Sequence, residues 1–345
     1  MNEAINDPGS DGSELPGWQA PVTNPTPVDI ESREEQTAEI EDAGHEALRQ
    51  MELFAVPADA VPPVFHDRNV LPVKVHTTRS PNVVDAFLFG VLMVLGLLIT
   101  TGFLGVALHF HWFGLRSFNE AQSDTRLALG SQLLIYLVGL TGAVPLFQMV
   151  WGKGFFAGIH WNEGVAFRNK GKLVLTAFGC NLIAVVGNYV LPFPQHAPID
   201  KLFSTAGDAW MLFVFGVTIA PFFEEMMFRG FLLPAMATAW DWSVERMTQT
   251  EPRPIDAEGN PVWSVAAMVF AALVVSAPFA LMHAAQVGNS WGPVSLLYCV
   301  SLILCAVRLW TRSLAASTLV HAAYNFMLFS VMLVETGGFR HLEKM

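Results

Sequence analysis

The chain contains several apolar runs long enough to cross a lipid bilayer, and this feature restricts its fold more than any other. A helix that crosses the hydrocarbon core needs about 20 residues at a rise of about 1.5 Å per residue. Each run is bounded by Trp, Pro, Gly or charged residues, and together they occupy approximately 85–108, 127–150, 173–192, 209–235, 262–284, 293–309 and 314–334. The sequence therefore predicts an all-α, polytopic bundle of membrane-spanning helices.

Two of these runs leave the number of spans open. The run 293–309 is short and is compatible with a re-entrant segment, whereas the long run 209–235 can be divided into two helices. We therefore expect seven or eight transmembrane helices.

Composition agrees with a membrane protein and excludes some partners. Hydrophobic residues make up 52% of the chain and charged residues 14%, whereas an ordinary soluble domain has about 25% charged residues. The formal net charge is −11, and no block of Lys and Arg occurs. Because binding to phosphates needs clustered basic side chains, we expect no nucleic-acid partner. The cysteines, Cys180, Cys299 and Cys305, form neither a CxxC pattern nor a disulfide framework.

The first 80 residues differ in composition from the rest of the chain. They hold 15 of the 30 acidic side chains and 5 of the 19 basic ones, and they begin without a basic or apolar signal segment. Residues 1–30 are rich in Pro, Gly, Asp and Asn, which predicts disorder. Within 31–54, an apolar stripe at helical spacing predicts an amphipathic helix and a possible site for a cytoplasmic partner. We therefore divide the chain into an acidic, mostly disordered tail, 1–80, and a transmembrane domain, 81–345.

The distribution of basic residues predicts the orientation of the helices. Lys and Arg near span ends are enriched on the cytoplasmic side of membrane proteins. With a cytoplasmic N-terminus, the inside receives Arg68, Lys74, Arg79, Lys153, Arg168, Lys170, Lys172, Arg246, Arg253, Arg308 and Arg312, and the outside receives Arg116, Arg126, Lys201, Arg340 and Lys344. We therefore expect the N-terminus in the cytoplasm.

The fourth run carries charged residues where they are energetically unfavourable. The segment TIAPFFEEMMFRGFLLP places Glu224, Glu225 and Arg229 in apolar surroundings, and each such charge costs about 2.5 to 3.5 kcal/mol at a helix centre. Glu225 and Arg229 are four residues apart, so they can pair on one helical face. Glu224 projects about 100° away. Because it has no local partner, Glu224 is expected to face a wet cavity or groups on other helices.

Two other runs supply candidate partners for Glu224. The fifth run contains PFALMHAAQ, which places Phe279 and His283 on one helical face, and the last contains TLVHAAYNF, which places His321 and Asn325 on one face. A single histidine in an apolar helix is usually a packing residue. Two histidines with an Asn and an unpaired Glu favour a functional site.

These residue types are suited to hydrolysis. A desolvated carboxylate such as Glu224 can act as general base toward water. Asn325 and an N–H of His321 can stabilise an oxyanion, and His283 can orient the water or the substrate carbonyl. Alternatively, His283, His321 and one Glu can provide three ligands to a catalytic zinc ion. The sequence has no HExxH and no GxSxG pattern, which excludes the common zinc-peptidase helix and disfavours a serine nucleophile.

The order and spacing of these residues resemble a known family. The pattern Glu224-Glu225-x-x-x-Arg229, Phe279-x-x-x-His283 and His321-x-x-x-Asn325 on successive apolar helices is similar to that of the CPBP intramembrane proteases, which include CAAX prenyl endopeptidases and bacteriocin-processing or immunity proteins. The resemblance covers about 205–330. It implies a helical membrane bundle in which Glu224 is the base, Glu225 and Arg229 support it, His283 binds water, and His321 and Asn325 stabilise the oxyanion. It leaves metal dependence open, so no cofactor is expected with certainty and Zn remains an option.

We therefore expect an intramembrane endopeptidase that cleaves a membrane-associated or prenylated protein or peptide substrate. The resemblance implies a bacterial plasma membrane as the location. One alternative is a non-catalytic binding or bacteriocin-immunity protein of the membrane. The other is a proton-coupled transporter, in which Glu224, His283 and His321 relay protons.

Overall fold

The computed structural model describes residues 81–114, 116–194, 197–256 and 260–344. The tail predicted at 1–80 and its amphipathic helix at 31–54 lie outside these ranges. Within them the chain is helical and forms no β-strand, apart from one isolated bridge between Ile255 and Pro261. The prediction of an all-α membrane bundle is confirmed, because the described residues contain 7 helices that are long and apolar enough to span a membrane.

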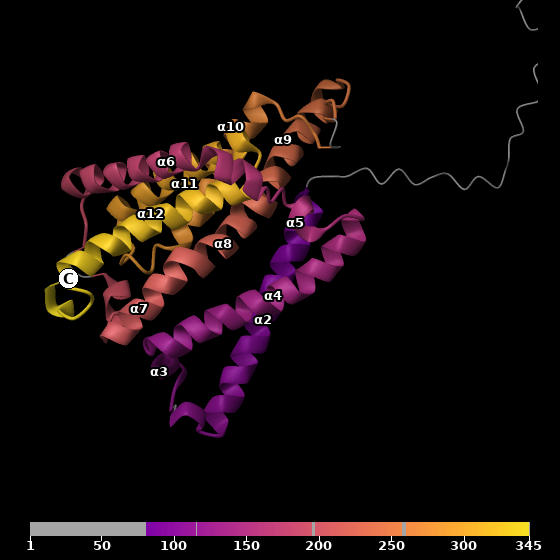
Figure 1. Ribbon diagram of the computed structural model, residues 1–345. Helices are drawn as coiled ribbons and strands as arrows, with labels where there is room; N and C mark the ends of the chain where they lie inside the picture. Colours follow the sequence, from indigo (N-terminus) through magenta and orange to yellow (C-terminus); the bar gives the residue numbers. More distant parts are fainter. Residues whose placement is uncertain (1–80, 115, 195–196, 257–259, 345) are drawn as a thin grey trace, which may run out of the picture. The chain divides into compact units, whose positions relative to one another are not determined.

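The spanning helices follow the predicted order along the chain. In Figure 1 they are α2 (Val83–His109), α4 (Thr125–Trp151), α6 (Glu163–Val190), the continuous segment Ala206–Thr248, α10 (Val265–Met282), α11 (Trp291–Thr311) and α12 (Leu314–Glu335). Two short helices, α3 (Phe118–Ser123) and α5 (Phe155–Gly158), lie on either side of α4 in the chain.

The third spanning helix begins ten residues earlier than expected. It starts at Glu163, after an N-cap at Asn162 whose side chain accepts a hydrogen bond from the Val165 amide. The prediction followed hydropathy and therefore excluded the polar stretch that includes Lys170 and Lys172. Lys and Arg are good helix formers, and their long side chains reach water from a helix end. A helix can therefore extend past the apolar run.

The two open questions about the number of spans are also answered for the described residues. The sixth run forms α11, which has 21 residues and therefore has the length of a full span. The fourth run does not divide; it continues as one helical segment of 43 residues to Thr248, beyond the predicted end at 235. Seven spans, rather than eight, are therefore present in this part of the chain.

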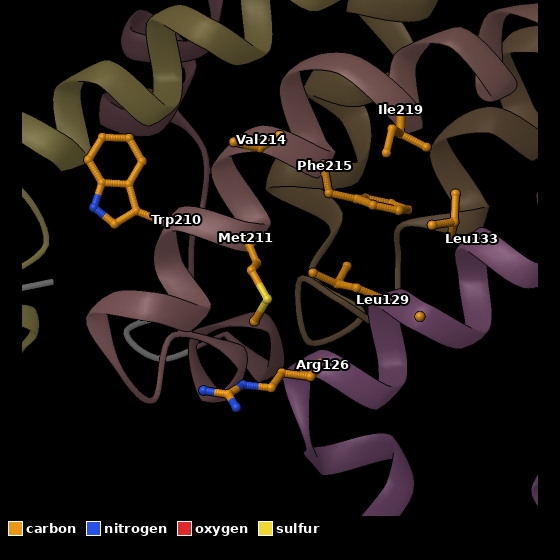
Figure 2. A pocket seen from close by; sticks show the side chains of 9 residues that line it. Arg126, Leu129, Leu133, Trp210, Met211, Val214, Phe215 and Ile219 are labelled. Atoms are coloured by element: carbon orange, nitrogen blue, oxygen red, sulfur yellow. The ribbon is translucent and has the colours of Figure 1, made fainter.

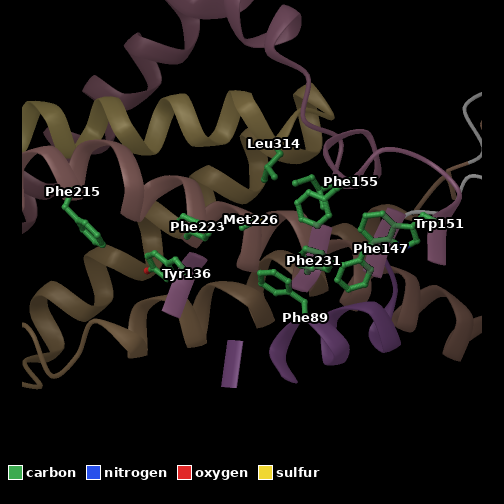
Figure 3. Packing of buried hydrophobic residues seen from close by; sticks show 12 residues of the cluster. Phe89, Tyr136, Phe147, Trp151, Phe155, Phe215, Phe223, Met226, Phe231 and Leu314 are labelled. Carbon is green, nitrogen blue, oxygen red and sulfur yellow. The ribbon is translucent and has the colours of Figure 1, made fainter. Parts of the chain in front are cut away.

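Two of the four buried clusters in the described ranges illustrate how the helices are held together. One, drawn in Figure 3, joins α2, α4, α5 and the fourth segment through stacked aromatic rings, such as Phe89 on Phe231 with centroids 4.3 Å apart. The other joins α6, α11 and α12 around Leu173, Val300 and Leu304. Helices in a bilayer associate through close packing rather than through exclusion of water. Gly96 illustrates this at the α2–α4 contact, because an added Cβ would lie 2.7 Å from the carbonyl oxygen of Ile135.

Candidate active site

The two glutamates lie on a short α-helical stretch between two π-helical turns. The fourth segment consists of α7 (Ala206–Val214), the π-turn η3 (Phe215–Ile219), α8 (Ala220–Glu225), the π-turn η4 (Met226–Leu232) and α9 (Leu233–Thr248). Each π-turn ends two residues before a proline, Pro221 or Pro234. Proline has no amide hydrogen and crowds the carbonyl four residues before it, so a wider turn relieves this conflict. π-turns of this kind are frequent at functional sites.

The first π-turn releases a backbone carbonyl that Asn325 then binds. The Ala220 amide donates to the Phe215 oxygen, five residues back, instead of to Gly216. The next residue, Pro221, has no amide hydrogen to donate in its place. The Asn325 side-chain amide, on α12, donates to the Gly216 oxygen at 2.7 Å. Asn325 therefore links α12 to the turn that precedes the glutamates.

Glu225 and Arg229 form the ion pair that their spacing predicts. Arg229 Nη1 lies 3.0 Å from Glu225 Oε1, and both side chains have no exposed surface. Arg229 Nη2 also donates to the carbonyl oxygen and the hydroxyl of Ser301 on α11, at 3.1 and 2.6 Å. The guanidinium lies 4.4 Å from the centre of the Phe279 ring. A buried charge pair is stable when further hydrogen bonds and a cation–π contact replace lost hydration, and this pair has both.

His321 connects the two glutamates. Its Nδ1 lies 3.0 Å from Glu225 Oε1, and its Nε2 lies 3.7 Å from Glu224 Oε2. Because Glu225 is paired with Arg229, its carboxylate accepts a hydrogen bond, so Nδ1 of His321 carries the hydrogen. In the neutral ring, the lone pair of Nε2 therefore faces Glu224.

His283 is oriented in the same sense by a backbone group. It caps α10, and its Nδ1 lies 2.8 Å from the carbonyl oxygen of Phe279. A carbonyl can only accept, so Nδ1 again carries the hydrogen. The Nε2 of His283 lies 3.8 Å from Glu224 Oε2. The neutral ring therefore presents a lone pair to the same carboxylate.

Glu224 is thus surrounded by acceptors and makes no direct hydrogen bond to a described residue. Its distances to the two Nε2 atoms, 3.7 and 3.8 Å, exceed hydrogen-bond length. Its side chain is 9% exposed, and that of His283 is 16% exposed. Three acceptors that converge in this way favour a small donor such as water between them.

The structure places the sequence-predicted residues in two groups. Glu224, Glu225, Arg229, His283 and His321 form one connected cluster, with contributions from α8, η4, α10 and α12. Asn325 lies on the same helix as His321, but its side chain donates a hydrogen bond to the backbone of η3. Its second amide hydrogen remains available for another acceptor.

We also tested whether these donors suit a metal ion. A zinc site needs at least three N, O or S ligands at about 2.0 to 2.3 Å from one point. Within the described ranges, no group of three His, Cys, Asp or Glu side chains is arranged to hold a metal ion. No cofactor is therefore established at this site, and no step below passes through a metal.

Two cavities lie near this cluster without including it. One, of about 440 Å³, runs between α4 and α7 and is apolar except for Arg126 near one end (Figure 2). The other, of about 490 Å³, lies among α6, α11 and α12 and is lined in part by Tyr324 and Val287. Tyr324 is three residues from His321 and Val287 is four from His283. The second cavity is thus lined by residues one helical turn from His321 and His283 in sequence. Glu224 lines neither cavity.

Several groups around the cluster were not identified from the sequence. Ser301 is an inconspicuous serine in an apolar run, and only its position against Arg229 gives it a role. Gln132 and Tyr136, on α4, form a hydrogen-bonded pair at 2.8 Å. Their spacing of four residues within the predicted run 127–150 was a usable signal, since polar side chains are rare in spanning helices.

A second polar group, which is partly buried, lies at the junction of α5, α11 and α12. Arg308 Nη2 lies 2.9 Å from His160 Nδ1, and His160 Nε2 lies 2.9 Å from Asn260 Oδ1. Burial, assisted by the positive charge of Arg308, lowers the pKa of His160 to about 4. The ring is therefore neutral at ordinary pH, with Nδ1 accepting and Nε2 donating. We refer to His160, Arg308 and Asn260 as the His160 cluster.

Comparison with known proteins agrees with the geometry. Residues 206–327 match the family described as type II CAAX prenyl endopeptidase Rce1-like. No curated protein and no protein of solved structure is similar enough to the chain to count as a match. The match spans about a third of the chain and contains Glu224, Glu225, Arg229, His283, His321 and Asn325. The protein is therefore an integral membrane protein, and the match of residues 206–327 to an Rce1-like domain supports a relationship to the CPBP intramembrane proteases.

Proposed function

We propose that this protein is an intramembrane endopeptidase that hydrolyses a peptide bond of a membrane-associated or prenylated substrate with water activated by Glu224. The observation that carries the proposal is the convergence of two histidine Nε2 atoms on Glu224 Oε2, at 3.7 and 3.8 Å, from three separate helical elements. An inert, structural carboxylate in a membrane protein would be expected to have direct hydrogen bonds. The family match supports peptidase chemistry at this site.

In the proposed first step, Glu224 acts as general base. A water molecule against Glu224, His283 and His321 donates one hydrogen to the carboxylate and another to an Nε2 atom. As Glu224 takes the proton, the water oxygen forms a bond to the carbonyl carbon of the substrate, and the π electron pair moves to the carbonyl oxygen. The product of this step is a tetrahedral oxyanion and a protonated Glu224.

In the second step, the C–N bond breaks and the amine leaves with the proton that Glu224 carries. The oxyanion needs donors while it exists. We assign this role to the second amide hydrogen of Asn325, the one that Gly216 does not accept, and to a His321 ring that has taken up a second proton, on Nε2, from solvent before the reaction. In that protonation state the attacking water donates to Glu224 and to His283 Nε2 only. Glu225 and Arg229 do not touch the substrate; they fix the His321 ring through Nδ1.

The test compares new protein termini in native membranes that express either the wild type or Glu224→Gln at equal abundance. This comparison requires no prior choice of substrate. Termini that depend on Glu224 support proteolysis and identify the substrate. If no Glu224-dependent terminus is found under several growth conditions, the proposal is wrong and a binding or immunity function becomes preferable.

The metal-free form of the mechanism has its own test. We expect the purified protein to retain its activity after dialysis against a strong chelator, because water activation is assigned to Glu224 alone. Loss of activity on chelation, with recovery on addition of Zn²⁺, would assign His283 and His321 to a metal instead.

A further inference from the structure

Gln132 and Tyr136 form a polar pair on a helix that carries none of the motif residues. They lie one helical turn apart on α4, and Gln132 Nε2 donates to the Tyr136 hydroxyl at 2.8 Å. Tyr136 is buried, with 9% of its surface exposed. Inside a membrane, such a pair is unfavourable unless its groups find partners.

The Tyr136 ring is held next to the glutamates. It stacks on Phe223, with centroids 4.3 Å apart and the planes inclined by 12°, and Phe223 directly precedes Glu224. On its other side it stacks with Phe215 of η3, at 6.4 Å. Figure 3 shows Tyr136 between these two residues. The Tyr136 hydroxyl is within electrostatic range of the Glu224 carboxylate.

The hydroxyl still has a donor to offer. It accepts from Gln132, and its own hydrogen has no acceptor within hydrogen-bond distance among the described residues. A buried donor without a partner is destabilising, which indicates an acceptor outside the protein, such as water. Glu224 Oε2 faces the two histidines without a direct hydrogen bond to either. Glu224 Oε1 also has no direct hydrogen bond to a described residue, so it is free to accept one from water.

We propose that Tyr136, oriented by Gln132, is a positioning residue of the proposed reaction: its O–H donates through one water molecule to Glu224 and holds the carboxylate with Oε2 toward His283 and His321. This inference rests on the proposed function and adds α4 to the site. Other charged groups near Glu224 are Glu225 and Arg229, on its own segment.

The test uses Tyr136→Phe, which keeps the ring and removes only the hydroxyl. The assay is cleavage, in proteoliposomes, of a peptide that carries a Glu224-dependent cleavage sequence. We expect kcat to fall by about 3- to 10-fold, the effect of losing one hydrogen bond to a neutral water molecule, with KM and the melting temperature unchanged. Gln132→Leu should lower kcat less, and should have no further effect when combined with Tyr136→Phe.

Two controls separate the possible outcomes. Tyr298→Phe removes a hydroxyl that donates to the Leu273 oxygen at 3.3 Å, away from the cluster, and should leave kcat unchanged. Tyr136→Leu, which removes the stacked ring, should lower the melting temperature as well. If Glu224→Gln is inactive but Tyr136→Phe has wild-type kcat, this inference is overturned and the proposed function stands. If Glu224→Gln is fully active, the proposed function is wrong, and the inference about Tyr136, which rests on it, is wrong as well.

Discussion

The Glu224 cluster consists of Glu224, Glu225, Arg229, His283 and His321. It and the His160 cluster are both polar and at least partly buried, but they use histidine in opposite ways. His160 has a direct partner on each ring nitrogen, Arg308 and Asn260, each at 2.9 Å. His283 and His321 have a close partner only on Nδ1, and their Nε2 atoms stop 3.7 to 3.8 Å from Glu224.

We interpret this difference as that between a structural polar cluster and the proposed reactive one. Direct hydrogen bonds on both nitrogens hold the His160 ring and tie the loop before α6 to the end of α11. The Leu314 amide adds a bond to the His160 carbonyl oxygen, at 2.9 Å. A polar group whose hydrogen bonds are satisfied adds rigidity, whereas an unsatisfied lone pair in a buried site is available to a water molecule or substrate. The comparison predicts that removing Glu224 mainly lowers activity, whereas changes in the His160 cluster mainly lower stability.

The largest effect is expected for Glu224→Gln, which keeps the shape of the side chain and removes its basicity. We expect a loss of about 10²- to 10⁴-fold in kcat, the usual contribution of a general base, with a melting temperature close to that of the wild type. The measurement is single-turnover cleavage alongside thermal unfolding in detergent. Unfolding of this variant would place Glu224 with the structural residues and remove the contrast between the clusters.

The next effect is on stability, at the Glu225–Arg229 pair. Arg229→Met leaves Glu225 as a buried, uncompensated charge, and such a change destabilises by about 3 to 5 kcal/mol. The double variant Glu225→Gln with Arg229→Met should recover much of this loss, because neither charge then remains. Denaturant unfolding in detergent measures both. Equal instability of the single and double variants would mean that the contacts of Arg229 with Ser301 and Phe279, rather than charge balance, stabilise the site.

The third prediction concerns pH and the His160 cluster. The pKa of His160 is about 4 in the folded protein, below its ordinary value of 6.5, so the unfolded chain takes up a proton first as pH falls. Stability is therefore complete above about pH 6.5, decreases from there to about pH 4, and levels off below. The total change for this group is about 3 kcal/mol, at about 1.4 kcal/mol per pH unit.

Unfolding measured between pH 7 and pH 4 tests this prediction against His160→Asn. The variant is expected to be less stable at pH 7 and to lose less stability on acidification. A pH dependence as steep in the variant as in the wild type would mean that another group controls it.

The smallest effect is expected at Asn325, which has a structural role, through its hydrogen bond to Gly216, and a proposed role as oxyanion donor. Asn325→Ala leaves the Gly216 carbonyl without its hydrogen bond, a loss of about 1 to 3 kcal/mol. Activity should fall by more than the folded fraction does, because the oxyanion donor is lost as well. If specific activity per folded molecule is unchanged, Asn325 acts only by supporting η3.

The sequence predicted those parts of the site that depend on helical spacing. Glu225 and Arg229 are four residues apart, and they pair as expected. The length of the apolar runs predicted seven or eight spans without deciding between them, and hydropathy alone missed the polar start of α6. Glu224 had no local partner, which led us to expect groups on other helices, and the Nε2 atoms of His283 and His321 lie 3.8 and 3.7 Å from its Oε2.

Contacts between distant residues could not be predicted in the same way. Arg308 and His160 are 148 positions apart, and Asn325 and Gly216 are 109 apart. Nothing in the chain between them specifies that they meet. The assignment of Gln132 and Tyr136 to the site likewise depends on the packing of α4 against Phe223.

The sequence by itself therefore determined a helical membrane protein with a fourth span that carries Glu224, Glu225 and Arg229. Hydropathy and helical period act over a few turns, so they can be read along the chain. Only the tertiary structure decided which nitrogen of each histidine faces Glu224, that Asn325 binds the carbonyl released by the turn before Pro221, and that α4 borders the site. These features depend on where separate helices meet, and side-chain packing sets that in three dimensions.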